Sequence, residues 1–474
     1  MKNLLTIISV IVIRVILEYA LIADHSLEPF QSILSISLFF LTIFSAALLI
    51  AVYSTKCKPS EALAFLAKIS PLILLPLLID VIASAGQPVY YGYATTTPSL
   101  EKLASLCYSC EGLTIGIKIE VIAFLAAMAY FVYSRTRKAL NAAASAIALY
   151  ACLFAMLFIP QILFNPADLS RPVVLNETLA LYAIATTLLT LALLCLENKK
   201  TFFAFASKPR LSRSLHYVAL FLTGAFLTKS TLIPLEASIR LLAGILSTVF
   251  AFQAAGLLND FFDEKIDAVN KSNRPLANNK KLFETALFFF LSLAFINSLA
   301  IGYEFTLLLA AGLCLSFLYS SPPLRLRNHF TTASLSIALI STLAIYAGAS
   351  AVSINPSQAF NLIPLNLAAM FFISVLLASN VKDLKDEKGD AANGVKTIPV
   401  LLKEKSRLAL SLLVALAFLI VPLLSTLALL PYAVLFTLTA SAALLFVKNP
   451  LSAEAWFFTS YFLLLLSFLF VYKP

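Results

Sequence analysis

The sequence predicts an all-α polytopic membrane protein with about 15 transmembrane helices. Hydrophobic residues make up 61% of its 474 residues, charged residues make up only 12%, and the mean hydropathy is +0.93. A transmembrane helix needs about 20 apolar residues, and roughly fifteen such stretches occur in the chain. This composition excludes a soluble enzyme, a disordered chain and a nucleic-acid-binding protein. It also excludes an outer-membrane barrel, whose strands are short and alternate in polarity.

The expected spans follow one another along the whole chain. The first six lie near residues 4–22, 32–53, 69–85, 113–133, 139–158 and 178–196. Nine more lie near 214–233, 238–257, 283–301, 305–321, 331–350, 363–379, 407–426, 430–447 and 454–472. The first segment is a span rather than a signal peptide, because Arg14 and Glu18 interrupt it and no small-residue cleavage site follows. These two residues are spaced i, i+4, and we expect them to pair inside the membrane, although a polar substrate site is an alternative.

Basic residues are distributed unevenly between the two sides of the predicted membrane. If the N-terminus is cytoplasmic, about 27 of the 34 Lys and Arg residues fall in loops on the cytoplasmic side. Cytoplasmic loops of membrane proteins are enriched in Lys and Arg, so this asymmetry and the net charge of +10 require no nucleic-acid partner. We therefore expect an integral protein of a prokaryotic cell membrane. Its N-terminus would be cytoplasmic and, because the span count is odd, its C-terminus exterior.

The basic, proline-containing stretch at 197–213 divides the chain into two membrane-embedded parts. We expect a six-helix domain at 1–196, a cytoplasmic linker at 197–213 and a nine-helix domain at 214–474. The first domain carries no signature that indicates a role. Cys107 and Cys110 form a C-x-x-C motif in a predicted exterior loop, where a dithiol can oxidise, but two ordinary cysteines or a structural disulfide are alternatives.

Two acidic segments directly follow predicted spans on the cytoplasmic side. Each contains an asparagine and three aspartates spaced i, i+3 and i+7, which places the aspartates on one face of a helix. The residues are Asn259, Asp260, Asp263 and Asp267 in the first segment and Asn380, Asp383, Asp386 and Asp390 in the second. A single motif of this kind is often only a solvated helix end. The repetition of the pattern on the same side indicates a site.

Carboxylates stacked on one helix face repel each other by roughly 3 kcal/mol per pair at about 6 Å. Neighbouring cations or a divalent metal ion must offset this repulsion. Carboxylate oxygens without His or Cys favour Mg²⁺ over zinc, and Mg²⁺ prefers one or two carboxylates together with substrate phosphate oxygens. Two such segments facing each other would therefore hold a diphosphate through Mg²⁺.

These segments resemble the two signatures of the UbiA superfamily of intramembrane prenyltransferases. Residues 256–277, GLLNDFFDEKIDAVNKSNRPLA, resemble the first signature, N-D-x-x-D-x-x-x-D followed by R-P. Residues 380–399, NVKDLKDEKGDAANGVKTIP, resemble the second, including its T-[IL]-P ending. The stretch YSSPPLRLR at 319–327 is similar to the segment after the family's fourth helix. The resemblance covers about 210–474 and implies a nine-helix bundle with a cytoplasm-facing cavity.

The resemblance implies Mg²⁺-dependent transfer of a polyprenyl group from a polyprenyl diphosphate to a membrane-associated acceptor. We assign metal binding to Asn259, Asp263, Asp267, Asp386 and Asp390, with Asp260 and Asp383 as further ligands or as partners of the ligands. The catalytic residues would be Asp263, Asp267, Asp386 and Asp390. Diphosphate oxygens would contact Arg274, Lys382, Arg325 and Arg327, although each of these is also what a cytoplasmic loop normally carries. Aromatic faces such as Tyr319 and Phe317 would shield the allylic cation from water.

The acceptor is less well defined by the sequence. Asn278 and Asn279 stand near the R-P motif, where many relatives that prenylate aromatic rings have a small residue and glycine. The second segment is most similar to the archaeal branch that makes digeranylgeranylglyceryl phosphate, an ether-lipid precursor. An aromatic prenyltransferase, a terpene cyclase and a prenyl-binding scaffold are alternatives within this fold. A transporter is the alternative from another class, but its ion sites normally lie near the membrane midplane on broken helices. The sequence does not indicate a protein partner.

Overall fold

The described part of the chain is built from helices and contains no strand. The computed structural model describes residues 2–21, 29–85, 114–163, 171–197, 199, 202–203, 211–228, 235–264, 280–353 and 359–472. Within these ranges, 14 helical segments are long and apolar enough to cross a membrane, and Ser214–Leu227 is a shorter apolar helix. The prediction of an all-α polytopic membrane protein is confirmed.

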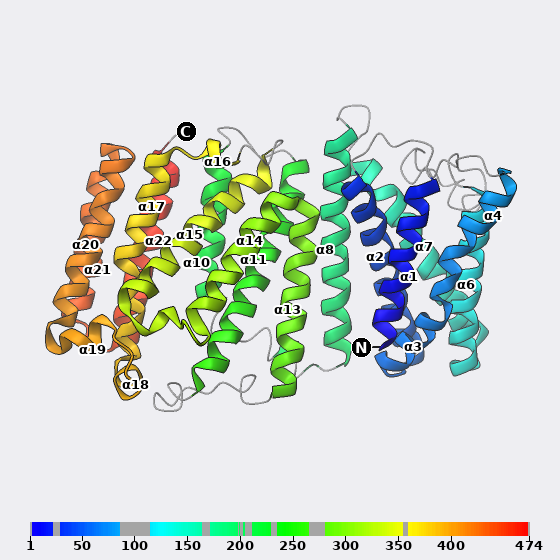
Figure 1. The fold of residues 1–474 in the computed structure, drawn as a ribbon, viewed down its shortest axis with the longest axis horizontal. Helices are drawn as coiled ribbons and strands as arrows, with labels where there is room; N and C mark the ends of the chain where they lie inside the picture. Colours follow the sequence, from blue (N-terminus) through cyan, green and yellow to red (C-terminus); the bar gives the residue numbers. More distant parts are fainter. Residues whose placement is uncertain are drawn as a thin grey trace. The chain divides into compact units, whose positions relative to one another are not determined.

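The chain divides into two compact units, Met1–Ala206 and Ser207–Pro474. The first contains six of the candidate spans. Its helices are α1 (Lys2–Leu21), α2 (Pro29–Thr55), α3 (Pro59–Ile69), the 3-10 helix η1 (Ser70–Leu74), α4 (Leu75–Ala83), α6 (Ile115–Thr136), α7 (Ala139–Leu163) and α8 (Arg171–Glu197) (Figure 1). Cys107 and Cys110 lie outside the described residues.

One span of the first unit starts earlier than the sequence predicts. We expected it to begin near residue 69. In the structure α3, η1 and α4 together form one candidate span, Pro59–Ala83. Glu61 Oε2 forms an ion pair with Arg135 Nη1 at 2.8 Å, and both side chains are exposed. The charged residues at this helix end are therefore accommodated outside the apolar core.

The second unit contains eight of the candidate spans and the shorter helix. Its membrane helices are α10 (Leu211–Leu227), α11 (Leu235–Phe262), α13 (Lys280–Ile301), α14 (Tyr303–Ser320), α15 (Phe330–Val352), α17 (Leu365–Ala378), α20 (Ser406–Leu424), α21 (Leu430–Phe446) and α22 (Pro450–Val471). Short helices connect them: α16 (Ala359–Leu362), α18 (Glu387–Ala392), α19 (Ile398–Leu402) and the 3-10 helices η2 (Leu326–Asn328), η4 (Ser379–Lys385), η5 (Lys403–Lys405) and η6 (Leu427–Leu429).

Glycine allows α10 and α15 to pack closely. A Cβ atom added at Gly224 on α10 would collide with the carbonyl group of Ile345, and one added at Gly348 on α15 would collide with that of Phe221. Small residues at such contacts let membrane helices approach through their backbones. This close packing fixes one wall of the second unit.

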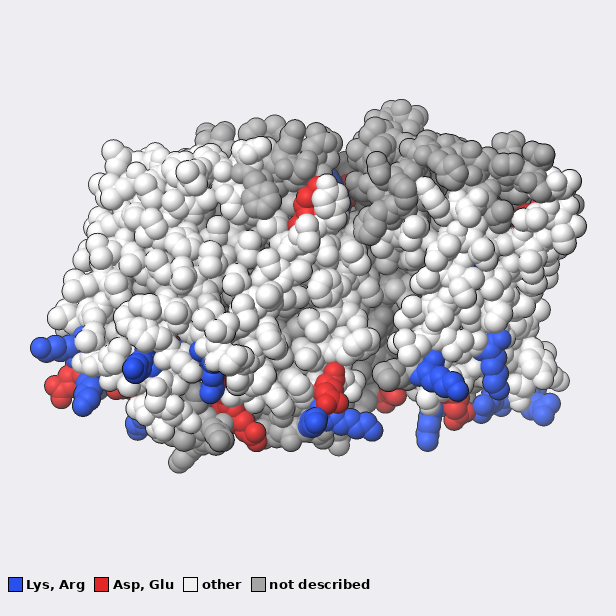
Figure 2. All heavy atoms as spheres, viewed as in Figure 1, with Lys and Arg blue, Asp and Glu red and all other residues white. Residues whose placement is uncertain are grey.

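Loops at one end of the second unit are tied together by backbone hydrogen bonds. Phe330 N donates to Lys396 O at 3.0 Å, and Lys396 N donates to Asn328 O at 2.8 Å. Figure 1 shows α18 and α19 at this end of the helices, and Figure 2 shows that most charged side chains visible on the second unit gather there. The rest of the described surface of the second unit in that view is largely uncharged, as expected for a surface in contact with lipid.

Candidate active site

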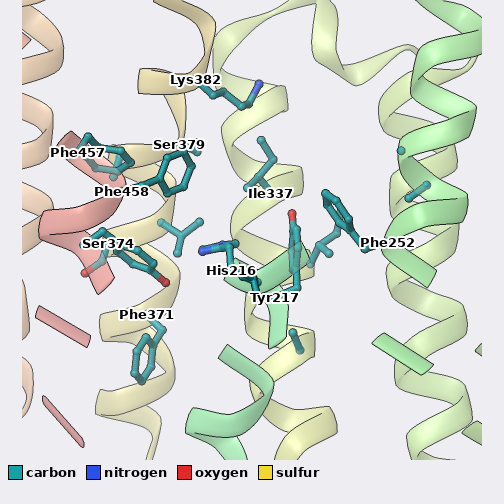
Figure 3. Close-up of a pocket in the computed structure, with 18 of the residues that line it drawn as sticks. His216, Tyr217, Phe252, Ile337, Phe371, Ser374, Ser379, Lys382, Phe457 and Phe458 are labelled. Carbon is teal, nitrogen blue, oxygen red and sulfur yellow. The ribbon is translucent and has the colours of Figure 1, made fainter. Parts of the chain in front are cut away.

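The second unit encloses a cavity of about 1080 Å³. Its lining comes from seven membrane helices, α10, α11, α14, α15, α17, α20 and α22, from η4, and from Arg327 of η2. Polar residues of both acidic segments line it, namely Asn259, Asp263, Lys382, Asp383, Lys385 and Asp386. Figure 3 shows Lys382 on one side of the labelled residues, with His216 and Ser374 between it and Phe371. The cavity therefore combines a charged region with an apolar, aromatic interior.

The first acidic segment presents two of its residues to the cavity. Helix α11 ends at Phe262, so Asp263 lies just beyond the helix and Asn259 lies in its last turn. Asn259 Nδ2 donates to Asp263 Oδ2 at 2.5 Å, and Ser320 Oγ donates to Asn259 Oδ1 at 3.3 Å. Asp260 is buried but is not part of the cavity lining. Asp267 and Arg274 lie outside the described residues.

The second acidic segment is not a single α-helix, which corrects our expectation of three aspartates on one helix face. Asp383 lies in the 3-10 helix η4, Asp386 follows it, and Asp390 lies in the short helix α18. The change of helix type breaks the 3.6-residue period that an i, i+3, i+7 spacing requires. Asp383 and Asp386 line the cavity, whereas Asp390 is buried and is not part of the lining.

Two arginines from the segment after α14 contact the aspartates. Arg325 Nη2 donates to Asp263 Oδ1 at 3.0 Å and to Phe262 O at 3.1 Å. Arg327 forms ion pairs with Asp263 and, at 3.4 Å, with Asp390. Arg327 therefore bridges the first and second acidic segments. From the sequence we expected both arginines to bind diphosphate oxygens. We did not expect them to be the cations that offset the repulsion between the carboxylates.

Lys382 connects the second segment to α14. Its Nζ donates to Asp383 Oδ1 at 2.7 Å and to Tyr319 Oη at 3.0 Å. Tyr319 lines the cavity, as expected for an aromatic shield. Phe317, which we expected in the same role, is half-exposed and is absent from the lining. Residues two apart on a helix point to different sides, so α14 directs only one of the two rings inward.

The carboxyl group of Asp390, which lies outside the membrane spans, has a raised pKa. Burial raises the pKa of its carboxyl group to about 6, and the nearby Asp383 and Asp386 act in the same direction. Arg327 and Lys382 lower this pKa, although burial has the largest effect. Arg327 and Lys382 therefore favour the charged form of Asp390, whereas burial disfavours it.

The cavity also contains neutral polar groups that the sequence analysis did not single out. His216 Nε2 lies 3.4 Å from Ser341 Oγ, while its Nδ1 has no hydrogen-bond partner among the described residues. The hydroxyl group of Tyr461 is likewise buried without a partner in the described part of the chain, and the two rings are 5.3 Å apart. The signal available in the sequence was His216 itself, because ionisable residues are rare inside membrane spans.

The available ligands fit a divalent metal ion held jointly with a substrate. Asn259, Asp263, Asp383 and Asp386 supply hard oxygen atoms to one cavity. No three His, Cys, Asp or Glu residues form a ready-made metal cluster in the part of the chain that the structure describes. Mg²⁺ usually needs only one or two carboxylates when substrate phosphates complete its coordination. The arrangement therefore suits binding of Mg²⁺ together with a diphosphate.

Comparison with known proteins defines the class. Residues 217–469 match the UbiA prenyltransferase family, and the chain belongs to this family. The resemblance noted in the sequence is confirmed, and the protein is a membrane-embedded prenyltransferase.

The individual relatives have low sequence identity to this chain. The chain is 27% identical over 212 residues to a digeranylgeranylglyceryl phosphate synthase of Methanothrix thermoacetophila, covering 44% of this chain and 77% of the relative. It is 32% identical over 181 residues to a 2-acylphloroglucinol 4-prenyltransferase of Humulus lupulus, covering 35% and 42%. A solved UbiA homolog from Archaeoglobus fulgidus matches with 19% identity and a TM-score of 0.43, covering 57% of this chain and 98% of that chain.

Proposed function

We propose that the protein transfers a polyprenyl group from a polyprenyl diphosphate to geranylgeranylglyceryl phosphate, in an Mg²⁺-dependent step of ether-lipid synthesis. The observation that carries this proposal is that Asp263, Asp383 and Asp386, from two distant segments, line one cavity. Its apolar interior suits an isoprenoid tail, and its charged region suits a diphosphate. The similarity to a digeranylgeranylglyceryl phosphate synthase supports this acceptor over an aromatic ring.

In the proposed reaction, the bond between C1 of the prenyl group and the diphosphate oxygen breaks. The acceptor hydroxyl oxygen forms a new bond to C1, diphosphate leaves, and the hydroxyl proton is released. Asn259, Asp263 and Asp386 would hold Mg²⁺, with Asp267 and Asp390 as further ligands and Asp260 and Asp383 as ligands or partners. Bound Mg²⁺ would neutralise charge that develops on the leaving diphosphate.

The basic residues would bind the leaving group. Lys382 lies in the cavity beside Asp383, and its ammonium group has hydrogen atoms to donate to diphosphate oxygens. Arg327, which lines the cavity, would contact the anion, and Arg325 and Arg274 would join it. Tyr319 would cover the allylic cation and keep water from it.

The neutral polar groups deeper in the cavity support an acceptor that carries a hydroxyl group. A hydrocarbon tail forms no hydrogen bonds, so it cannot satisfy the buried His216 Nδ1 or the Tyr461 hydroxyl group. A hydroxyl-bearing acceptor can do so. This argument favours transfer to oxygen over cyclisation of the prenyl chain alone.

The test is an assay of the purified protein with labelled geranylgeranyl diphosphate and Mg²⁺. We expect a labelled ether product with geranylgeranylglyceryl phosphate and no transfer to a phenolic acceptor. Transfer to the phenol alone would show an aromatic prenyltransferase. Product formation without any acceptor would show a terpene cyclase. Either result would overturn the proposed acceptor.

We also propose that the N-terminus is cytoplasmic and the C-terminus exterior. The proposal rests on the excess of Lys and Arg on one side of fifteen spans. A reporter enzyme that is active only in the cytoplasm, fused after Lys473, should be inactive. The same reporter fused within the basic linker at 197–213 should be active. Activity of the Lys473 fusion would show that the span count is wrong by one.

A further inference from the structure

The first unit carries charged residues inside its apolar helices. Arg14 and Glu18 on α1 are fully buried. Arg14 Nε lies 2.7 Å from Glu18 Oε2, which confirms the pairing that their spacing predicts. Arg14 Nη1 also donates to Ile73 O at 2.8 Å, and its guanidinium group lies 5.7 Å from the ring centre of Phe40. The charges of these two residues therefore compensate each other.

Asp80 on α4 has a structural role. Its Oδ1 accepts a hydrogen bond from Gly116 N at 2.9 Å, and its Oδ2 accepts one from Thr114 Oγ1 at 2.5 Å. Thr114 is the N-cap of α6 and accepts from Ile117 N. Asp80 therefore anchors the start of α6, where a negative charge is favourable.

Glu120 on α6 has no such partner. It is 9% exposed, and its carboxylate makes no hydrogen bond or ion pair with any residue that the structure describes. Arg14, Glu18 and Asp80 are near enough to act on it electrostatically. One guanidinium group thus faces three carboxylates, and an uncompensated charge among apolar helices is costly.

Glu120 lines a cavity with aromatic walls. The cavity measures about 70 Å³, several times the roughly 10–15 Å³ that one water molecule needs. Its aromatic lining consists of Phe39, Phe40, Phe44, Phe124, Tyr150 and Phe154. Lys118 lines it as well, but the charges that act on Glu120 are those of Arg14, Glu18 and Asp80.

We propose that this cavity binds an alkylammonium group, with Glu120 as its counter-ion and the aromatic rings around its methyl or methylene groups. Aromatic faces attract cations within about 6 Å, and the position of Arg14 over Phe40 shows that this wall already accepts one. A metal ion is a poorer fit, because the described residues hold no group of three metal-ligating side chains.

The position of Glu120 indicates how the ligand enters. Helix α6 begins at Ile115, so Glu120 lies about 8 Å along its axis at 1.5 Å per residue. A group bound there is close to the end of the helix rather than at the centre of a span. An amphipathic amine can therefore reach Glu120 with its head while its apolar part stays among the helices or in lipid.

The test compares choline with 3,3-dimethylbutan-1-ol, its uncharged isostere, by calorimetry on the full-length protein in phosphatidylglycerol nanodiscs. These lipids carry no amine that would compete. We expect choline to bind about tenfold or more tightly than the isostere, because only choline brings a positive charge. Glu120→Gln should weaken choline binding by about tenfold or more and leave the isostere unaffected.

Two further variants control this experiment. Glu61→Gln removes one negative charge from the exposed end of α3 in the same unit and should leave choline binding unchanged. Tyr150→Leu removes one partly exposed ring from the cavity wall and should weaken choline binding, so it serves if Glu120→Gln does not fold. Equal affinity for choline and its isostere, or no binding of either, would mean that Glu120 only holds a proton and would overturn the proposal. Unchanged choline binding in folded Glu120→Gln would overturn it too.

Discussion

The single residue Asp263 has two functions. It lines the cavity as a proposed metal ligand, and it forms ion pairs with Arg325 and Arg327. The sequence suggested that removing one carboxylate would only relieve repulsion. The structure shows instead that the Asp263 carboxylate compensates two guanidinium groups. Removing it would take one partner from each group, so that Arg325 would keep Phe262 O and Arg327 would keep Asp390.

Alanine substitutions at Asp263 and at Asp386 test the proposed metal site, and the Asp263 variant also tests its ion pairs. Each substitution should lower prenyl transfer by orders of magnitude, because each removes a proposed metal ligand. Asp263→Ala should also destabilise the protein, by roughly 1–3 kcal/mol, since it removes one acceptor from each of the partly buried guanidinium groups of Arg325 and Arg327. Transfer rates and thermal unfolding of both variants, at matched abundance in detergent, check this. Full activity in either folded variant would remove that residue from the proposed site.

At the element scale, the close approach of α10 and α15 depends on a residue without a side chain. Gly348→Ala should destabilise the second unit by roughly 1–3 kcal/mol, because the new methyl group would collide with the carbonyl of Phe221. Gly312→Ala on α14 is the matched control, since nothing lies within 4 Å of a Cβ atom there. Thermal unfolding of the two variants gives the comparison. Equal stability would show that α10 and α15 separate at little cost.

Helices and contacts were predictable from the sequence where they depend on residues close together in the chain. Apolar stretches of span length identified the membrane helices, and the i, i+4 spacing of Arg14 and Glu18 identified their ion pair. Features that depend on packing were not predictable. The 3-10 geometry of η4 breaks the helical period around Asp383, and Arg327 reaches Asp390 across 63 residues of chain. Sequence spacing contains no information about such contacts.

At the scale of the whole molecule, the second unit contains all the residues proposed for prenyl transfer. A chain that begins at Ser207, where the second unit starts, should therefore insert in the membrane and retain measurable transfer activity. It loses an even number of spans and keeps basic residues before α10, so its orientation should be unchanged. Turnover of a labelled polyprenyl diphosphate in membranes measures this. A folded but inactive chain would mean that the first unit contributes to the reaction.

The central claim is that both acidic segments form one site that holds a diphosphate through Mg²⁺. The most direct measurement is the rate at which the full-length protein consumes labelled geranylgeranyl diphosphate, first with Mg²⁺, then with EDTA, then with Mg²⁺ restored. We predict that EDTA abolishes consumption and that added Mg²⁺ restores it, because carboxylates and diphosphate repel each other without a cation between them. Consumption at an undiminished rate in EDTA would contradict the claim.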